Sequence, residues 1–317
     1  MCRKPLYGRR SVMKHLEDSV VHEKVKKSSS DKLFLRSCTV VMALLMVIVL
    51  LPLMNIISSS FSNPSAVGTG KVWLLPVDFS LQSYKNVLKY ENVWIGYRNT
   101  ILYTLVGTVM NVVVTLMCAF PLSQHSFAGR KAVNKILFFT MIFSGGMIPN
   151  YLVVKQLHML NTIWSVLIPG LMSAYNVMIT RNYIETNIPG ELQDAARVDG
   201  CTPVKFFKNF IIPLSKPIIA VIAMYYAVGH WNAYFNAFLY LNDRNLYPLQ
   251  LFLRDILVNS KFDSSIIDDP EMAQVVQSQA DALKYSIIVI ATLPLMCVYP
   301  LVQKYFVMGV MVGSVKG

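Results

Sequence analysis

Residues 37–57 read SCTVVMALLMVIVLLPLMNII, a run of 21 residues without Lys, Arg, Asp or Glu. A helix rises about 1.5 Å per residue, and the hydrocarbon core of a bilayer is about 30 Å thick, so this run is long enough to cross it. Lipid offers no partners to backbone N–H and C=O groups, and such a segment must therefore satisfy them internally. The sequence predicts a membrane-spanning α-helix here.

Five further runs of at least 19 residues also lack charged side chains, namely 99–123, 136–154, 161–180, 217–242 and 285–303. The whole chain follows this pattern, because 54% of its 317 residues are hydrophobic and only 15% are charged. A soluble protein carries about 25% charged residues. We predict an all-α, polytopic membrane helix bundle with six transmembrane helices. The composition disfavours a water-soluble enzyme and excludes a disordered or collagen-like chain.

The basic residues predict the orientation of this bundle, because cytoplasmic segments of membrane proteins are enriched in Lys and Arg. If the N-terminus lies inside, the cytoplasmic tails and loops hold 20 of the 29 basic residues. We therefore expect both termini in the cytoplasm, with a basic tail at residues 1–32 and a transmembrane domain at 33–317. Membrane topology accounts for the net charge of +12 better than nucleic-acid binding does, since the excess lies in short loops and one tail.

Several kinds of chemistry are missing from the sequence. The five cysteines have no spacing typical of a metal site or of a disulfide framework. Residues 65–72, SAVGTGKV, resemble a phosphate-binding loop, but Ser and Val stand where that motif needs Gly and Ser or Thr. We expect no catalytic residue, no metal ion and no ATP site in this chain.

No Lys, Asp or Glu lies in the middle of a predicted span, which argues against an ion-coupled secondary transporter. The ionisable candidate is His230, near the outer end of the fifth span and next to Trp231. A histidine at the membrane interface is the favoured interpretation, and a proton relay is the alternative.

Gly and Pro interrupt several spans. The third contains FSGGMIPNY at 143–151, the fourth contains Pro169 and Gly170, and the sixth contains Pro294 and Pro300. Such breaks are expected where neighbouring helices or a water-filled cavity satisfy the freed backbone groups. A single Pro indicates an ordinary kink, but together these breaks favour a helix bundle around a pathway over a simple anchor.

The outer end of the fifth span combines amides with aromatic rings, which suit the hydroxyls and C–H faces of sugars. The candidates for a substrate path are Trp231, Asn232, Tyr234 and Asn236. The alternative is the aromatic belt of a membrane interface. The long outer loops, 58–98 and 243–284, are candidate docking surfaces for an external partner. The first contains a predicted short amphipathic helix with Ser80 as its N-cap.

The loop between the fourth and fifth spans, NIPGELQDAARVDGCTPVKFFKNFIIPLSKP at 187–217, predicts two short helices. Asn187 is the expected cap of the first helix and Gly200 its end, while Thr202 followed by Pro203 begins the second. One side of the first helix carries Leu192, Ala195, Ala196 and Asp199. Small residues there let another protein approach closely, so this surface is predicted to dock a cytoplasmic partner.

This loop resembles a signature of the permease subunits of bacterial type I ABC importers. That signature reads Glu-Ala-Ala, three residues, Gly, nine residues, Ile-x-Leu-Pro. Here it stands as Asp194-Ala195-Ala196, Gly200 and Phe210-Ile211-Ile212-Pro213, with the spacing complete and three conservative departures. The stretch WNAYF at 231–235 and the ending GSVKG at 313–317 are similar to the carbohydrate class, in particular to the smaller maltose-type permease subunit. FSGGMIPNYLVVKQLHMLNTIW at 143–164 is similar to oligosaccharide permeases of the LplC-like subgroup.

The resemblance implies a fold, partners and a mechanism. The loop at 186–216 would contain a coupling helix, at about 190–200, that docks on a separate ATPase. Its site residues would be Glu191, Asp194, Ala195, Ala196, Asp199, Gly200 and Pro213. The chain would pair with a second homologous permease, two ATP-binding subunits that hold ATP and Mg²⁺, and an extracytoplasmic solute-binding protein. It would lie in the lipid bilayer of a bacterial cell membrane and import a sugar or oligosaccharide without being an enzyme. The alternatives are the same class of permease for a non-sugar solute and an ion-coupled secondary transporter.

Overall fold

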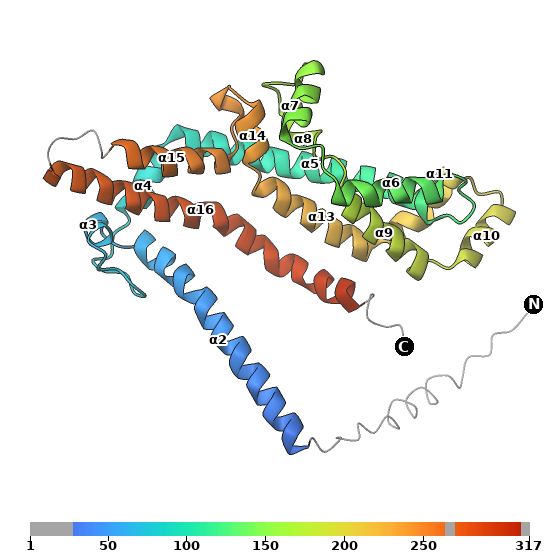
Figure 1. Cartoon of the computed structure of the whole chain (residues 1–317), viewed down its shortest axis with the longest axis horizontal. Helices are drawn as coiled ribbons and strands as arrows, with labels where there is room; N and C mark the ends of the chain where they lie inside the picture. The colour runs from blue at the N-terminus through green and yellow to red at the C-terminus, as the bar shows by residue number, and fades with distance from the viewer. Residues whose placement is uncertain (1–27, 264–269, 312–317) are drawn as a thin grey trace, which may run out of the picture. The chain divides into compact units, whose positions relative to one another are not determined.

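The structure is a computed structural model that describes residues 28–263 and 270–311 (Figure 1). Within these ranges all regular elements are helical. Most of the predicted basic tail lies outside the described residues, and so does most of the GSVKG ending. The chain divides into two compact units, residues 1–53 and 54–317.

The described part of the first unit belongs to helix α2, Ser29–Ser60. Its apolar side chains are exposed on every side, from Leu33 at 70% to Leu53 at 45% exposed. The Thr39 hydroxyl donates to the carbonyl of Leu35 at 2.8 Å, so this polar group is satisfied within the helix. A helix that is apolar all round suits a lipid environment, and the first predicted helix is confirmed.

Helix α5, Glu91–Ser123, is the central element of the second unit. It packs against α9 (Ala174–Asn187), α13 (Lys216–Trp231) and α15 (Leu249–Asp263). Helix α16, Pro270–Met311, covers α13 and α15 in turn. Each of the four clusters of buried apolar side chains includes residues of α5. This helix therefore connects the separate cores of the second unit.

Within residues 28–263 and 270–311, three helices are long and apolar enough to cross a membrane, namely α2, α5 and residues 275–298 of α16. Two bent pairs raise the number to five if each pair is one span. The first pair is α6 (Arg130–Ile142) with α7 (Met147–Gln156), bent by 116°, and the second is Pro203–Leu214 with α13, bent by 80°. The predicted all-α membrane bundle is confirmed, but the count of six spans is not.

The fourth predicted span, 161–180, is not a single helix. It consists of α8, Ile163–Leu167, and the start of α9, with a break at Pro169 and Gly170. The third span is broken at 143–146, where Gly146 adopts φ +82°. The predicted interruption of the sixth span is wrong, because α16 continues through both Pro294 and Pro300.

The remaining elements of the second unit are short. They are α3 (Pro64–Gly68), α4 (Gln82–Lys89), α14 (Phe235–Tyr240) and the 3₁₀ turn η2 (Arg244–Leu246). Helix α4 is the predicted amphipathic helix of the 58–98 loop. The N-cap of α4 is Leu81 and not the predicted Ser80, although the Ser80 hydroxyl oxygen accepts a hydrogen bond from the Gln82 N–H at 3.2 Å.

Candidate functional site

The loop that carries the signature forms helix α10, Gly190–Val198, between α9 and α13. Pro189 occupies its N-cap position. The predicted Asn187 cap is wrong, because the Asn187 amide donates back to the carbonyl of Tyr183 in α9 at 3.0 Å. Asn187 is still helical as the last residue of α9, so its side chain cannot reach the first turn of α10.

The end of α10 is a Schellman motif, as the position of Gly200 predicts. The Cys201 N–H donates to the Ala196 carbonyl at 2.8 Å, and the Gly200 N–H donates to the Arg197 carbonyl at 3.0 Å. Gly200 adopts φ +72°, a left-handed conformation in which a Cβ is strained. The glycine therefore fixes the direction in which the chain leaves α10.

The second predicted helix begins as expected, at Pro203 with Thr202 as N-cap. It continues from α11 (Pro203–Phe206) into a π-helical turn, η1 (Phe207–Ile211), and then α12 (Ile212–Leu214). Pro213 lies two residues after the end of this π turn and offers no backbone N–H to continue an α-helical ladder. The chain then bends by 80° into α13.

Helix α10 packs against the rest of the second unit through its apolar side. Ala196 is 7% exposed and lies in a core with Ile188, Phe206 and Ile211, while Leu192 packs against the same core. Residues of α5 and α9 belong to the same core, so α10 packs against both helices through it. Of the predicted docking residues, Ala196 thus contacts the chain itself.

The opposite side of α10 is open. Its exposed side chains are Glu191, Asp194, Ala195, Arg197, Val198 and Asp199. Val198 is 89% exposed, and Val204 on the following helix is 77% exposed. Three carboxylates and one guanidinium give this surface a net negative charge beside two apolar side chains.

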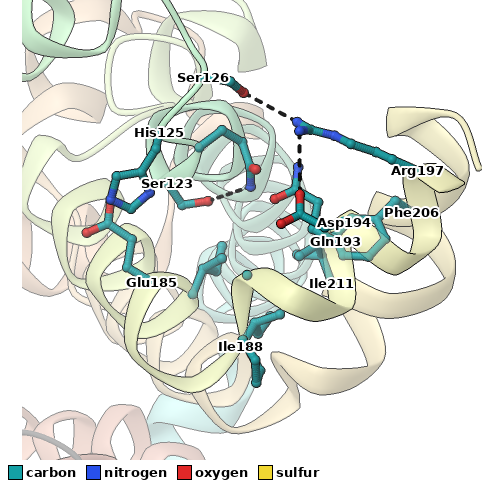
Figure 2. Close-up of a pocket in the computed structure, with 14 residues that line it drawn as sticks. Ser123, His125, Ser126, Glu185, Ile188, Gln193, Asp194, Arg197, Phe206 and Ile211 are labelled. Atoms are coloured by element: carbon teal, nitrogen blue, oxygen red, sulfur yellow. Dashed lines mark hydrogen bonds and ion pairs between the residues drawn. The ribbon is translucent and has the colours of Figure 1, made fainter.

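A cavity of about 250 Å³ lies between α10, the end of α5 and α9 (Figure 2). Arg197 reaches across its rim, with its guanidinium 3.8 Å from the Asp194 carboxylate and 3.3 Å from the Ser126 hydroxyl. A second cavity, of about 340 Å³, lies between α10, α11 and the end of α5, and Gln193 and Arg197 line both. Helix α10 thus lies between two cavities.

An ion-pair cluster fixes the base of the first cavity. Glu185 of α9 accepts from the Arg181 guanidinium through two bonds of 3.0 Å and also pairs with Arg130 at the start of α6. All three side chains are at most 20% exposed. The spacing of Arg181 and Glu185, four residues apart on one helix, is visible in the sequence, but the contribution of Arg130 is not.

The four candidates for a substrate path do not form one surface. Trp231 is 8% exposed and donates its indole N–H to the Ala291 carbonyl of α16 at 3.0 Å. Asn232 is exposed and bonds to the Val228 carbonyl within its own helix at 3.0 Å. Tyr234 is exposed and Asn236 is half-buried. In this structure Trp231 joins α13 to α16, whereas Asn232 and Tyr234 face outward.

His230 belongs to a polar network that supports the break in the fourth span. Asn111 of α5 is fully buried and donates its amide N–H to the Gly170 carbonyl at 2.6 Å. Its amide oxygen lies 2.8 Å from Nε2 of His230. One turn earlier in α13, the Tyr226 hydroxyl lies 2.8 Å from that of Thr115 and accepts from the Ser173 N–H at 3.1 Å.

This network satisfies backbone groups that the break leaves open, as expected for a Gly-Pro interruption supported by neighbouring helices. Asn111, Thr115 and Tyr226 were not predicted as functional from the sequence. Each of these polar residues stands within an uncharged run, which could have marked it as a candidate. The sequence does not show which interrupted helix its hydrogen bonds support.

A comparison with models of known protein families gives no match. Among individual proteins, Protein LplC of Bacillus subtilis (strain 168) is 38% identical over 270 residues, which cover 85% of this chain and 90% of LplC. The polygalacturonan/rhamnogalacturonan transport system permease protein YtcP of the same organism is 37% identical over 270 residues, covering 85% of this chain and 93% of YtcP. The chain belongs to the permease subunits of sugar ABC transporters.

A solved structure agrees with this assignment of the permease. A chain in the crystal structure of a bacterial ABC transporter involved in the import of the acidic polysaccharide alginate is 34% identical. Its TM-score is 0.78, and the match covers 88% of this permease and 99% of that chain. The resemblance inferred from the 194–213 signature is therefore confirmed, and the permease is a membrane-embedded protein of a sugar importer.

Proposed function

We propose that this permease is one half of the membrane pathway of an ATP-driven importer, and that α10 docks on a separate ATPase. The exposed face of α10 carries this proposal, because it is acidic, has apolar side chains at its tip and is connected through Ala196 to the core of α5 and α9. Docking through this face would involve Glu191, Asp194, Ala195 and Asp199. Gly200 and Pro213 would set the direction of the chain around it.

The packing suggests how motion of α10 reaches the membrane helices. Helix α10 lies between α9 and α13 in the chain, and the polar network of Asn111 and Tyr226 joins the far ends of both helices to α5. A tilt of α10 would therefore move α9 and α13 together relative to α5. Rigid-body motion of this kind fits two packed states better than continuous deformation. The permease itself makes and breaks no covalent bond in this scheme.

The complex would contain a second homologous permease, two ATP-binding subunits that hold ATP and Mg²⁺, and an extracytoplasmic binding protein. Both termini would be cytoplasmic, as the distribution of basic residues predicts. An unusually exposed apolar surface supports contact with lipid or the second permease along α6 and α7. Its members include Ile136, Phe138, Ile142 and Ile148, each more than half exposed.

The substrate is proposed to be an acidic oligosaccharide. YtcP is named for polygalacturonan and rhamnogalacturonan, and the transporter of known structure imports alginate, an acidic polysaccharide. Polygalacturonan and alginate are both built from uronic acids, whose carboxylates distinguish them from neutral sugars. A neutral oligosaccharide is the alternative within the same class.

Substitution of the docking face tests the proposal. Gly200→Val forces a β-branched residue into φ +72°, and Ala195→Arg places a long cation in the middle of the docking face. Both variants should remain in the membrane but lose sugar uptake and copurify without the ATPase. Gly70→Val is the matched control, because Gly70 has a similar φ of +69° and open surroundings far from α10 in the sequence. Normal uptake and ATPase recovery in both α10 variants would refute docking at this face.

A further inference from the structure

A third cavity, of about 290 Å³, lies at the opposite end of α5 from α10, between α5, α15 and α16. Figure 1 shows α15 lying alongside both α5 and α16. The floor of the cavity is apolar and well buried, with Val93 and Ile287 at 2% and Phe252 at 6% exposed. Its rim is polar and consists of Tyr90, Asn92, Arg244 and Asp255.

Arg244 is an exposed cation on a rigid backbone. The turn η2 that carries it is capped by the Asp243 carboxylate, which accepts from the Asn245 N–H at 2.9 Å. Asn99 of α5 donates its amide to the carbonyls of Asn245 and Tyr247 at 2.7 and 3.0 Å. Tyr103 donates to the Leu246 carbonyl at 2.8 Å. These bonds fix the position from which the guanidinium extends.

The carboxylates near the cavity bond to groups other than Arg244, so its guanidinium can bind an anion. Asp255 on the same rim pairs with Arg254 at 3.6 Å, and the Arg254 guanidinium lies 4.1 Å from the centre of the Phe238 ring. Asp243 is occupied by its own turn. Within the part of the chain that the structure describes, Arg244 forms no ion pair. The rim therefore presents one uncompensated positive charge.

We propose that this cavity is a subsite for one uronate unit of the transported oligosaccharide, with Arg244 binding the carboxylate. A sugar ring has apolar C–H faces that fit the Phe252 and Val93 floor, and hydroxyls that fit the amide of Asn92 and the phenol of Tyr90. A planar guanidinium matches a carboxylate through two parallel hydrogen bonds. The volume is near the lower limit of ligand pockets, roughly 300 Å³, and suits a single ring. This inference rests on the proposed function, namely import of acidic oligosaccharides.

The test uses the complete transporter in proteoliposomes with trigalacturonate and its fully methyl-esterified form, which is neutral. Arg244→Gln should raise the KM for trigalacturonate by about 10- to 100-fold, the effect expected from losing a charge-assisted bond, and leave uptake of the ester unchanged. Arg244→Lys should restore part of the difference. Lys85→Gln is the matched control, because Lys85 is an exposed cation on α4 that does not line the cavity.

The outcomes separate the subsite from the proposed function. If the wild type imports trigalacturonate and Arg244→Gln leaves its KM unchanged, the subsite is refuted while the function stands. If the wild type imports the ester but not trigalacturonate, the acidic substrate class fails and the subsite fails with it. Equal losses for both sugars, together with loss of copurified anionic phospholipid, would overturn the proposal in favour of a lipid headgroup site.

Discussion

Replacing Asn111 by Leu tests whether the polar network holds the broken fourth span. Leu branches at the same atom as Asn but has no hydrogen-bonding group. The substitution removes the 2.6 Å bond to the Gly170 carbonyl and the 2.8 Å contact with His230. Asn111 is fully buried, whereas Gly170 is exposed and His230 is half-buried, so water replaces the lost hydrogen bonds only in part.

The cost follows from the two groups left without partners. A buried polar group without a hydrogen bond costs about 1–3 kcal/mol. Side-chain hydrogen bonds within membranes average only about 0.6 kcal/mol, because the unfolded chain in the membrane also finds partners. Two interactions between these limits give an expected loss of about 2–4 kcal/mol in the free energy of unfolding.

The measurement is unfolding of the purified permease complex by SDS in mixed micelles, with Asn182→Leu as the control. Asn182 is exposed on α9, and its substitution should change the free energy of unfolding by less than about 0.5 kcal/mol. A double-mutant cycle with His230→Phe should give a coupling energy above about 0.5 kcal/mol. A loss below 0.5 kcal/mol for Asn111→Leu, or no coupling to His230, would refute the assignment of this network as the support of the break.

Three further substitutions probe other contacts. Gly96→Ala should destabilise the fold by about 1–3 kcal/mol in the same unfolding assay, because a Cβ there would lie 2.9 Å from the Leu249 Cα. Gly145 has open space around it, so Gly145→Ala should leave the stability unchanged. Equal effects of the two substitutions would contradict the close approach of α5 and α15. Glu185→Gln leaves two arginines without their carboxylate and should lower the free energy of unfolding by about 1–3 kcal/mol. This loss is smaller than for a fully buried pair, since the side chains are partly exposed. A loss that does not change with salt concentration would argue against an ionic origin. Trp231→Phe keeps an aromatic ring but removes the hydrogen bond to α16. It should lower the free energy of unfolding by about 1 kcal/mol and leave uptake intact. Complete loss of uptake with normal stability would instead place this residue in the substrate path.

The sequence was most informative where one residue type meets a local requirement of the backbone. Gly200 could be assigned to the end of α10 because only glycine adopts φ +72° without strain, and Thr202 followed by Pro203 marked the next helix. The predicted N-cap at Asn187 is wrong, although Asn is a good capping residue. Helix α9 extends to Asn187 itself, and the length of that helix depends on its packing against α5, which no local pattern encodes.

The amino-acid sequence is sufficient to predict a helical membrane protein and, through its signature, a permease of the ABC importer class. Lipid forces long uncharged runs into helices, and the spacing of the 194–213 signature is a linear property of the chain. Which interruptions break a helix depends instead on tertiary contacts. Pro169 and Gly170 break one because Asn111 and Tyr226, far away in sequence, satisfy the freed groups, whereas α16 continues through Pro294 and Pro300. Tertiary contacts also bury Trp231 against α16, and within the described residues they give Arg244 no ion pair, since partners for buried and charged groups come from distant segments brought together by folding.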